Sequence, residues 1–265
     1  MSYKQKRKEI SEPDQFIKTS TEYWSVAAAN KKLIISVACG LLALAIVIIV
    51  LSNVSKAKIQ ASGEALSAAL TLAERPIKGD PMAAMASEEL TPFETRQAKY
   101  EAIEAALTAL RDEHTGTRAA NTAAYYLADA KLQLGKAEEA DKLYELYIAS
   151  AKAGSPLRLM ALEGRGYVAE QRADANAALA FFEQMGSEAK DEQWKAKAAY
   201  HRGRMLVLKG QKAEAAEAFA KIGKDFAKAT SINMLAQERL AVLATEGIRP
   251  PAPEAEAKTD AKATP

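Results

Sequence analysis

The chain has 265 residues, of which 49% are hydrophobic, 6% aromatic and 26% charged, with one cysteine and two histidines. A single cysteine excludes a disulfide framework and a cysteine-cluster zinc site, and the abundance of alanine indicates packed helices rather than a β-sandwich or barrel. The formal net charge of +2 shows no excess that would indicate nucleic-acid binding.

The first 32 residues form a basic tail, with seven lysines and arginines against four acidic residues. Positive charge is retained on the cytoplasmic side of a membrane, so the cluster KQKRK predicts that residues 1–32 are cytoplasmic. Tyr23 and Trp24 are either interfacial anchors or part of a short amphipathic helix on the membrane surface.

An uncharged segment of 23 residues lies between Lys32 and Lys56. Its apolar core, residues 33–51, has 19 residues and would be about 28 Å long as an α-helix, close to the hydrocarbon thickness of a bilayer. The run is longer than the core of a cleavable signal peptide, and a buried soluble helix would carry a polar face. We therefore predict a single uncleaved transmembrane helix over residues 33–54.

The remainder of the chain contains internal repeats. Three segments share steps of 12, 4 and 3 residues between two small and two large side chains: Ala128, Ala140, Tyr144 and Tyr147; Gly166, Ala178, Phe182 and Met185; and Gly203, Ala215, Phe219 and Ile222. The segments recur at intervals of 38 and 37 residues. This pattern resembles the tetratricopeptide repeat, which implies an α-solenoid of paired helices A and B over residues 55–247.

The small residues of the repeat are expected where the two helices cross, because they let the backbones approach. The aromatic residues then fill the space toward the neighbouring repeat. The residues expected to make this repeat packing are Ala128, Ala140, Tyr144, Gly166, Ala178, Phe182, Gly203, Ala215 and Phe219.

Degenerate elements are expected at both ends of these three repeats. Ala102, Ala106 and Ala109 indicate helix B of a first repeat, preceded by a helix A over residues 56–75. A closing amphipathic helix is expected over residues 231–247, with its side chains Ile232, Leu235, Leu240 and Leu243 covering the last repeat. Residues 248–265 are rich in proline, alanine and charge, and we expect a disordered tail.

No arrangement of residues indicates catalysis. The sequence has no phosphate-binding loop, no nucleophile elbow and no metal-spaced histidines or cysteines, so we expect no catalytic, cofactor or metal site and no enzyme activity. His114 and His201 have no second imidazole or thiol nearby in the sequence and are interpreted as surface or packing residues.

In a tetratricopeptide solenoid, helix A lines the concave side, and a candidate protein-binding surface follows from the repeat register. Six side chains are expected to face inward: Tyr125, Asp129, Glu163, Tyr167, Tyr200 and Arg204. Tyrosine combines apolar area with a polar tip, which is typical of contact hot spots. Packing in the core is the alternative for each tyrosine.

The layout of a basic tail, one membrane helix and divergent repeats of this period resembles the ancillary subunit family of the SecYEG translocon. The resemblance implies a single-pass protein of the bacterial inner membrane with a cytoplasmic N-terminus and a periplasmic repeat domain. It also implies a non-enzymatic scaffold that contacts SecYEG, a periplasmic chaperone of the peptidyl-prolyl isomerase type and exported clients, with no small-molecule substrate. A scaffold of another envelope complex, for cell division or outer-membrane assembly, and a cytoplasm-facing signalling adaptor remain alternatives.

Overall fold

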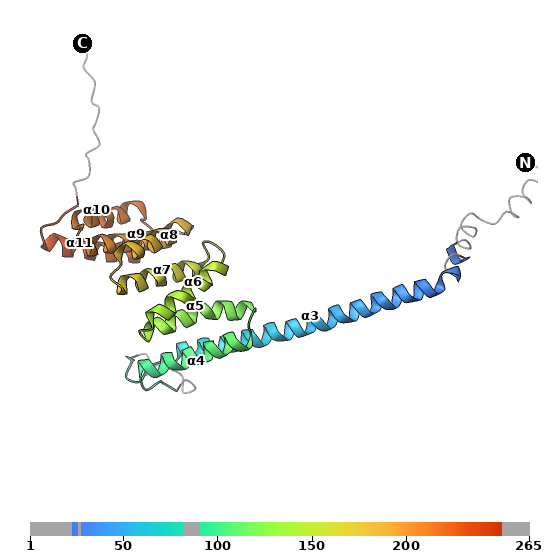
Figure 1. Ribbon diagram of the computed structural model, residues 1–265. Helices are drawn as coiled ribbons and strands as arrows, with labels where there is room; N and C mark the ends of the chain where they lie inside the picture. Colours follow the sequence, from blue (N-terminus) through green and yellow to red (C-terminus); the bar gives the residue numbers. More distant parts are fainter. Residues whose placement is uncertain (1–22, 26–27, 82–90, 251–265) are drawn as a thin grey trace, which may run out of the picture. The chain divides into compact units, whose positions relative to one another are not determined.

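The computed structural model describes residues 23–25, 28–81 and 91–250. Within these ranges the chain is all-helical, and the only strand-like feature there is an isolated parallel bridge between Ile77 and Phe93. The labelled helices (Figure 1) are α3 (Lys31–Glu74), α4 (Arg96–Glu113), α5 (Arg118–Gln133), α6 (Ala137–Ser150), α7 (Pro156–Gln171), α8 (Ala175–Glu188), α9 (Glu192–Leu208), α10 (Lys212–Asp225) and α11 (Thr230–Thr245). Most of the predicted basic tail, residues 1–22, and residues 251–265 of the predicted disordered tail lie outside the described residues.

The chain divides into two units, Met1–Lys58 and Ile59–Pro265. Helix α3, which begins in the first unit, is the one helix of the described residues that is long and apolar enough to span a membrane. The side chains of residues 33–51 are exposed, as a lipid-facing helix requires. Ser36 donates its hydroxyl to the carbonyl of Leu33 at 2.8 Å, so this polar group is satisfied within the helix.

Helix α3 does not end at residue 54, where the predicted span ends, but continues to Glu74. No proline or glycine occurs between residues 41 and 62, so nothing interrupts the backbone hydrogen bonding there. The last turns of the helix belong to the second unit, where Ala69 is buried in one apolar cluster with Ile103 and Leu107 of α4.

Local sequence signals fix the ends of several helices in the second unit. Thr95, Thr117 and Asp174 each accept a hydrogen bond from the backbone N–H three residues later, which caps α4, α5 and α8. The turns after α5 and α9 pass through Gly135 and Gly210 at positive φ, a conformation that glycine adopts without a Cβ clash. The equivalent turn after α7 has an alanine at φ 58°, Ala173.

Consecutive helices from α4 to α11 pack against one another in chain order (Figure 1). The predicted repeat-packing positions are all buried: Ala128, Ala140, Tyr144, Gly166, Ala178, Phe182, Gly203, Ala215 and Phe219. The rings lie directly on glycines, since a Cβ added at Gly166 would be 2.3 Å from Phe182 Cε1, and one at Gly203 would be 2.5 Å from Phe219 Cε1. The helices can approach this closely because glycine has no side chain at the point of contact.

The first, degenerate helix B is shifted by one residue from the prediction. Ala109 is exposed, and the buried side chains of α4 are Ile103, Leu107 and Leu110. They have the same 4 and 3 residue steps and stand 37 residues before Ala140, Tyr144 and Tyr147. Leucine and isoleucine form the core here, whereas the prediction placed the alanines of this helix in the core.

Helix α11 covers the last repeat with a face that also differs in part from the prediction. Ile232 and Leu243 are buried and Leu240 is partly buried, as expected. Leu235 is 41% exposed, and Ala236 takes its place in the core. Ala236 lies in one apolar cluster with residues of α9 and α10.

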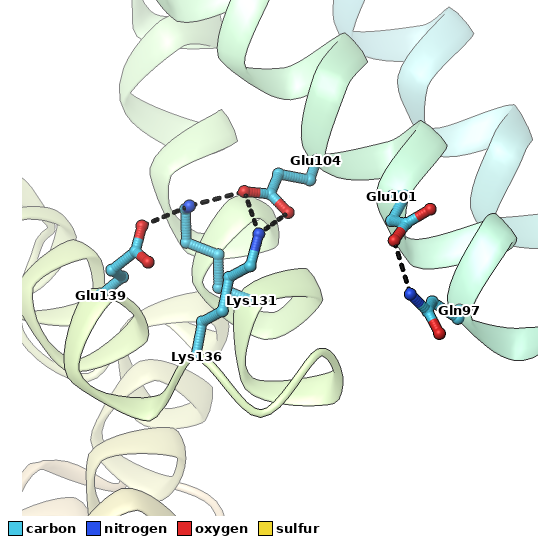
Figure 2. A network of polar contacts seen from close by, with 6 residues as sticks. All are labelled: Gln97, Glu101, Glu104, Lys131, Lys136 and Glu139. Carbon is cyan, nitrogen blue, oxygen red and sulfur yellow. Dashed lines mark hydrogen bonds and ion pairs between the residues drawn. The ribbon is translucent and has the colours of Figure 1, made fainter.

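An ion-pair network holds α4 to the helices that follow it (Figure 2). Glu104 of α4 accepts hydrogen bonds from Lys131 of α5 at 2.7 Å and from Lys136 at 2.8 Å. Lys131 also pairs with Glu139 of α6 at 2.6 Å. The two lysines hold the pKa of the Glu104 carboxyl below its ordinary value, so this carboxylate stays charged and connects three helices.

Candidate functional site

The structure separates the six predicted contact positions into two sets of three. Tyr125, Glu163 and Tyr200, each three residues before the small residue of helix A, are only 6%, 6% and 8% exposed. They belong to the core and not to the surface. Asp129, Tyr167 and Arg204, each one residue after the small residue, are partly exposed and remain candidate contact residues.

The buried tyrosines make aromatic contacts inside the second unit. Tyr125 of α5 has ring centroids 6.0 Å from Tyr144 and 5.9 Å from Tyr147, and burial raises the pKa of its hydroxyl. Tyr200 of α9 lies 5.7 Å from Phe219. In these two helices the position three residues before the small residue therefore packs on the neighbouring helix B.

Glu163 is the centre of a buried polar cluster that joins α7 and α9. Its Oε1 accepts hydrogen bonds from the Tyr167 hydroxyl at 3.0 Å and from Nε2 of His201 at 2.9 Å, and its Oε2 accepts from Lys197 at 2.7 Å. Burial alone would raise the pKa of this carboxyl, but the hydrogen bonds from His201 and Lys197 outweigh it and the pKa lies below the ordinary value. Three donors thus compensate the burial of one carboxylate.

His201 is held in its neutral form by two partners with fixed roles. Its Nδ1 lies 2.9 Å from Nη1 of Arg204, and because a guanidinium can only donate, Nδ1 is the acceptor and Nε2 carries the proton given to Glu163. Burial lowers the pKa of the imidazole, and the nearby Arg204 and Lys197 charges add to this, against the opposite influence of Glu163. The ring stacks on Phe182 with centroids 4.3 Å apart.

Two open hollows are lined by Arg204, the residue that donates to His201, and together we call them the groove. The first, about 410 Å³, is lined by α5, α7 and α9 through Leu132, Gln133, Tyr167, Glu170, Gln171 and Arg204. The second, about 220 Å³, is lined by Glu170, Arg204, Val207, Leu208, Phe219 and Arg239. The ion pair between Glu170 Oε1 and Arg204 belongs to both hollows, so they adjoin at this pair. The other carboxylate oxygen, Glu170 Oε2, is buried and accepts no hydrogen bond from the described residues.

Most of the groove residues were missed from the sequence, although a signal was available. They occupy repeat-equivalent pairs on the alternate helices α5, α7 and α9: Leu132 and Gln133, Glu170 and Gln171, and Val207 and Leu208. Each pair follows a predicted position, Asp129, Tyr167 or Arg204, by three and four residues, which places it on the same helix face. The contact between Glu163 and His201 also follows the repeat, because the two residues are 38 positions apart.

Among the described residues, no group of three or more histidine, cysteine, aspartate or glutamate side chains could hold a metal ion. The chain matches no protein-family model, and neither a curated protein nor a solved structure resembles it significantly. What the groove can bind is therefore inferred from its lining residues alone, which include hydrogen-bonding and aliphatic side chains.

Proposed function

We propose that this chain is a non-enzymatic scaffold that is anchored in a membrane by α3. Its helices α4 to α11, here called the helical unit, bind segments of other proteins in the groove. The groove is the observation that carries the proposal. Equivalent positions on α5, α7 and α9 present both polar and aliphatic side chains along it. A surface repeated from helix to helix suits a polypeptide, which presents its own side chains at regular intervals.

We also propose that the helical unit is a divergent tetratricopeptide-like α-solenoid. The 12, 4 and 3 residue steps of three repeats support this interpretation. So do the packing of consecutive helices and the burial of the small and aromatic repeat positions. In such a solenoid, α5, α7 and α9 are the A helices. They contribute all of the groove residues except Phe219 and Arg239.

The likeness in layout to the ancillary subunit of the SecYEG translocon supports a more specific proposal. The chain would be a single-pass protein of the bacterial inner membrane, with its N-terminus in the cytoplasm and its repeats in the periplasm. Its partners would be SecYEG, a peptidyl-prolyl isomerase-type chaperone and exported clients. A scaffold for cell division or outer-membrane assembly, and a cytoplasm-facing signalling adaptor, are the competing proposals.

Photo-crosslinking in intact membranes tests the scaffold proposal. A photoreactive amino acid at Leu208, which is 59% exposed in the groove, is expected to capture partner proteins. The matched control is Leu146 of α6, which is 50% exposed and outside the groove. Capture of translocon subunits, the chaperone or export clients from Leu208 alone supports the specific proposal. Equal capture from both positions, or none from either, contradicts binding in the groove.

Reporter fusions after residue 247 test the orientation separately. A reporter that is active only in the periplasm is expected to be active, because the basic tail should stay in the cytoplasm. Activity of a cytoplasmic reporter at the same position would eliminate the export proposal and favour the signalling adaptor.

A further inference from the structure

The second hollow of the groove contains an arginine that forms no ion pair with a carboxylate of the described residues. Of its three charged residues, Glu170 and Arg204 form an ion pair with each other. The third, Arg239 of α11, is exposed and donates from Nε to the hydroxyl of Tyr200 at 3.3 Å. No ion pair joins Arg239 to a carboxylate of the described residues; the adjacent Glu238 acts on it only from beyond ion-pair distance and does not line the hollow.

Aliphatic surface lies in the same hollow as this guanidinium. Val207 and Leu208 of α9 line it, and Leu208 is 59% exposed. Phe219 closes the floor and is itself fully buried. The hollow therefore combines apolar walls with one guanidinium that has no ion-pair partner among the described residues.

We propose that this hollow binds an external protein segment in which an acidic side chain is flanked by aliphatic residues. The carboxylate pairs with the Arg239 guanidinium, and the aliphatic side chains lie on Val207 and Leu208. Charge complementarity selects this occupant, since a basic segment would bring a like charge to Arg239 and a neutral one would offer only uncharged acceptors, which bind a guanidinium more weakly than a carboxylate does. The inference rests on the proposed function of the groove and specifies the chemistry of its partner.

An array of synthetic peptides tests the inference. The peptides come in matched sets that differ only at a central residue, glutamate, glutamine or lysine, between leucine and valine flanks. They are probed with the full-length protein in detergent micelles. Binding is expected to be about fivefold stronger for glutamate than for glutamine, and weakest for lysine, with the preference declining as salt is added.

Two arginine variants identify the residue responsible. Arg239→Gln is expected to bind the glutamate and glutamine peptides equally. Arg202→Gln, the matched control, changes an arginine of α9 whose side chain is 60% exposed and does not line the hollow, and it should keep the preference. A glutamate preference that survives in Arg239→Gln overturns the inference.

The remaining outcomes separate this inference from the proposed function. Peptide binding by the unmodified protein without preference for glutamate overturns the acidic partner and leaves the groove as a peptide site. If the unmodified protein binds none of the peptides and no partner is captured from Leu208, both proposals are overturned. Stronger peptide binding after deletion of residues 251–265, which contain Glu254 and Glu256, would identify the chain's own terminus as the occupant and overturn an external partner.

Discussion

Replacement of Gly166 by alanine is expected to destabilise the helical unit, although alanine is the better helix former. The new Cβ would lie 2.3, 2.5 and 2.9 Å from three atoms of the Phe182 ring, where ordinary contacts are 3.4–4 Å. The ring would have to retreat by about 1 Å. It is fully buried and stacked on His201, so there is little space behind it. Overpacking of this kind costs about 1–3 kcal/mol, against a gain of about 1 kcal/mol in helix propensity.

Urea unfolding of the full-length protein in detergent, followed by far-ultraviolet circular dichroism, measures this balance. The matched control is Gly223→Ala in α10, where the nearest atom to an added Cβ is 3.8 Å away on Asn233, so about 0.5–1 kcal/mol of stabilisation is expected. A second change, Phe182→Leu, should cost less in the Gly166→Ala background than in the unmodified protein, because the smaller side chain makes room for the methyl group. If Gly166→Ala is as stabilising as Gly223→Ala, the ring does not lie on the glycine and the reasoning fails.

Three further predictions concern capping and pH. Thr117→Ala removes the side-chain cap of α5 and should cost about 1 kcal/mol in urea unfolding, whereas Thr117→Ser should retain most of the stability. Hydrogen bonds from Arg158 lower the pKa of Glu188 to about 2, so its contribution to stability is present above about pH 4.5 and is lost as the pH falls toward 2. Unfolding measured across this range should show a smaller loss in Glu188→Gln, and an unchanged loss would contradict the role of the pair. The pKa of His201 is lowered by burial, so the unfolded chain takes up the proton first, and stability should decline as the pH falls through about 6.5. This decline should be reduced in His201→Gln; an identical pH profile would show that another group is responsible.

The repeat pattern predicted the helical packing because it depends on residue size at fixed spacing. Gly166 under Phe182 and Gly203 under Phe219 are contacts between positions that the 12 and 4 residue steps already relate. At Gly166 and Gly203 only glycine leaves space for the ring, whereas the first repeat has Ala128 at the equivalent position. The spacing of small and aromatic residues is therefore enough to predict which of them pack against each other.

The rotation of each helix was less predictable, because alanine occurs on both faces of the helices. Ala109 and Ala128 are the same residue type, yet one is exposed and the other fully buried. Tyrosine is similarly ambiguous: Tyr200 is buried, while the equally plausible Tyr167 is partly exposed and lines the groove. Which of the two faces solvent depends on the neighbouring helices and not on the residue itself.

The Glu163 cluster shows a further limit of reasoning from one helix at a time. The repeat register predicts Glu163 on the concave contact surface, and the sequence predicts His201 as a surface or packing residue. Their partnership exists because α7 and α9 place repeat-equivalent turns side by side, where one carboxylate meets an imidazole at 2.9 Å and an ammonium group at 2.7 Å. Comparing polar residues one period apart would have identified this pair.

The main packing partners of each helix from α4 to α11 are helices one or two places away in the chain. Sequence separations between contacting residues are therefore short, and chains of low contact order fold quickly because little loop entropy is lost before contacts form. Each new helix can also dock on one that is already in place, as in other linear arrays of repeats. The helical unit can therefore fold progressively from its N-terminal end while the rest of the chain is still being synthesised.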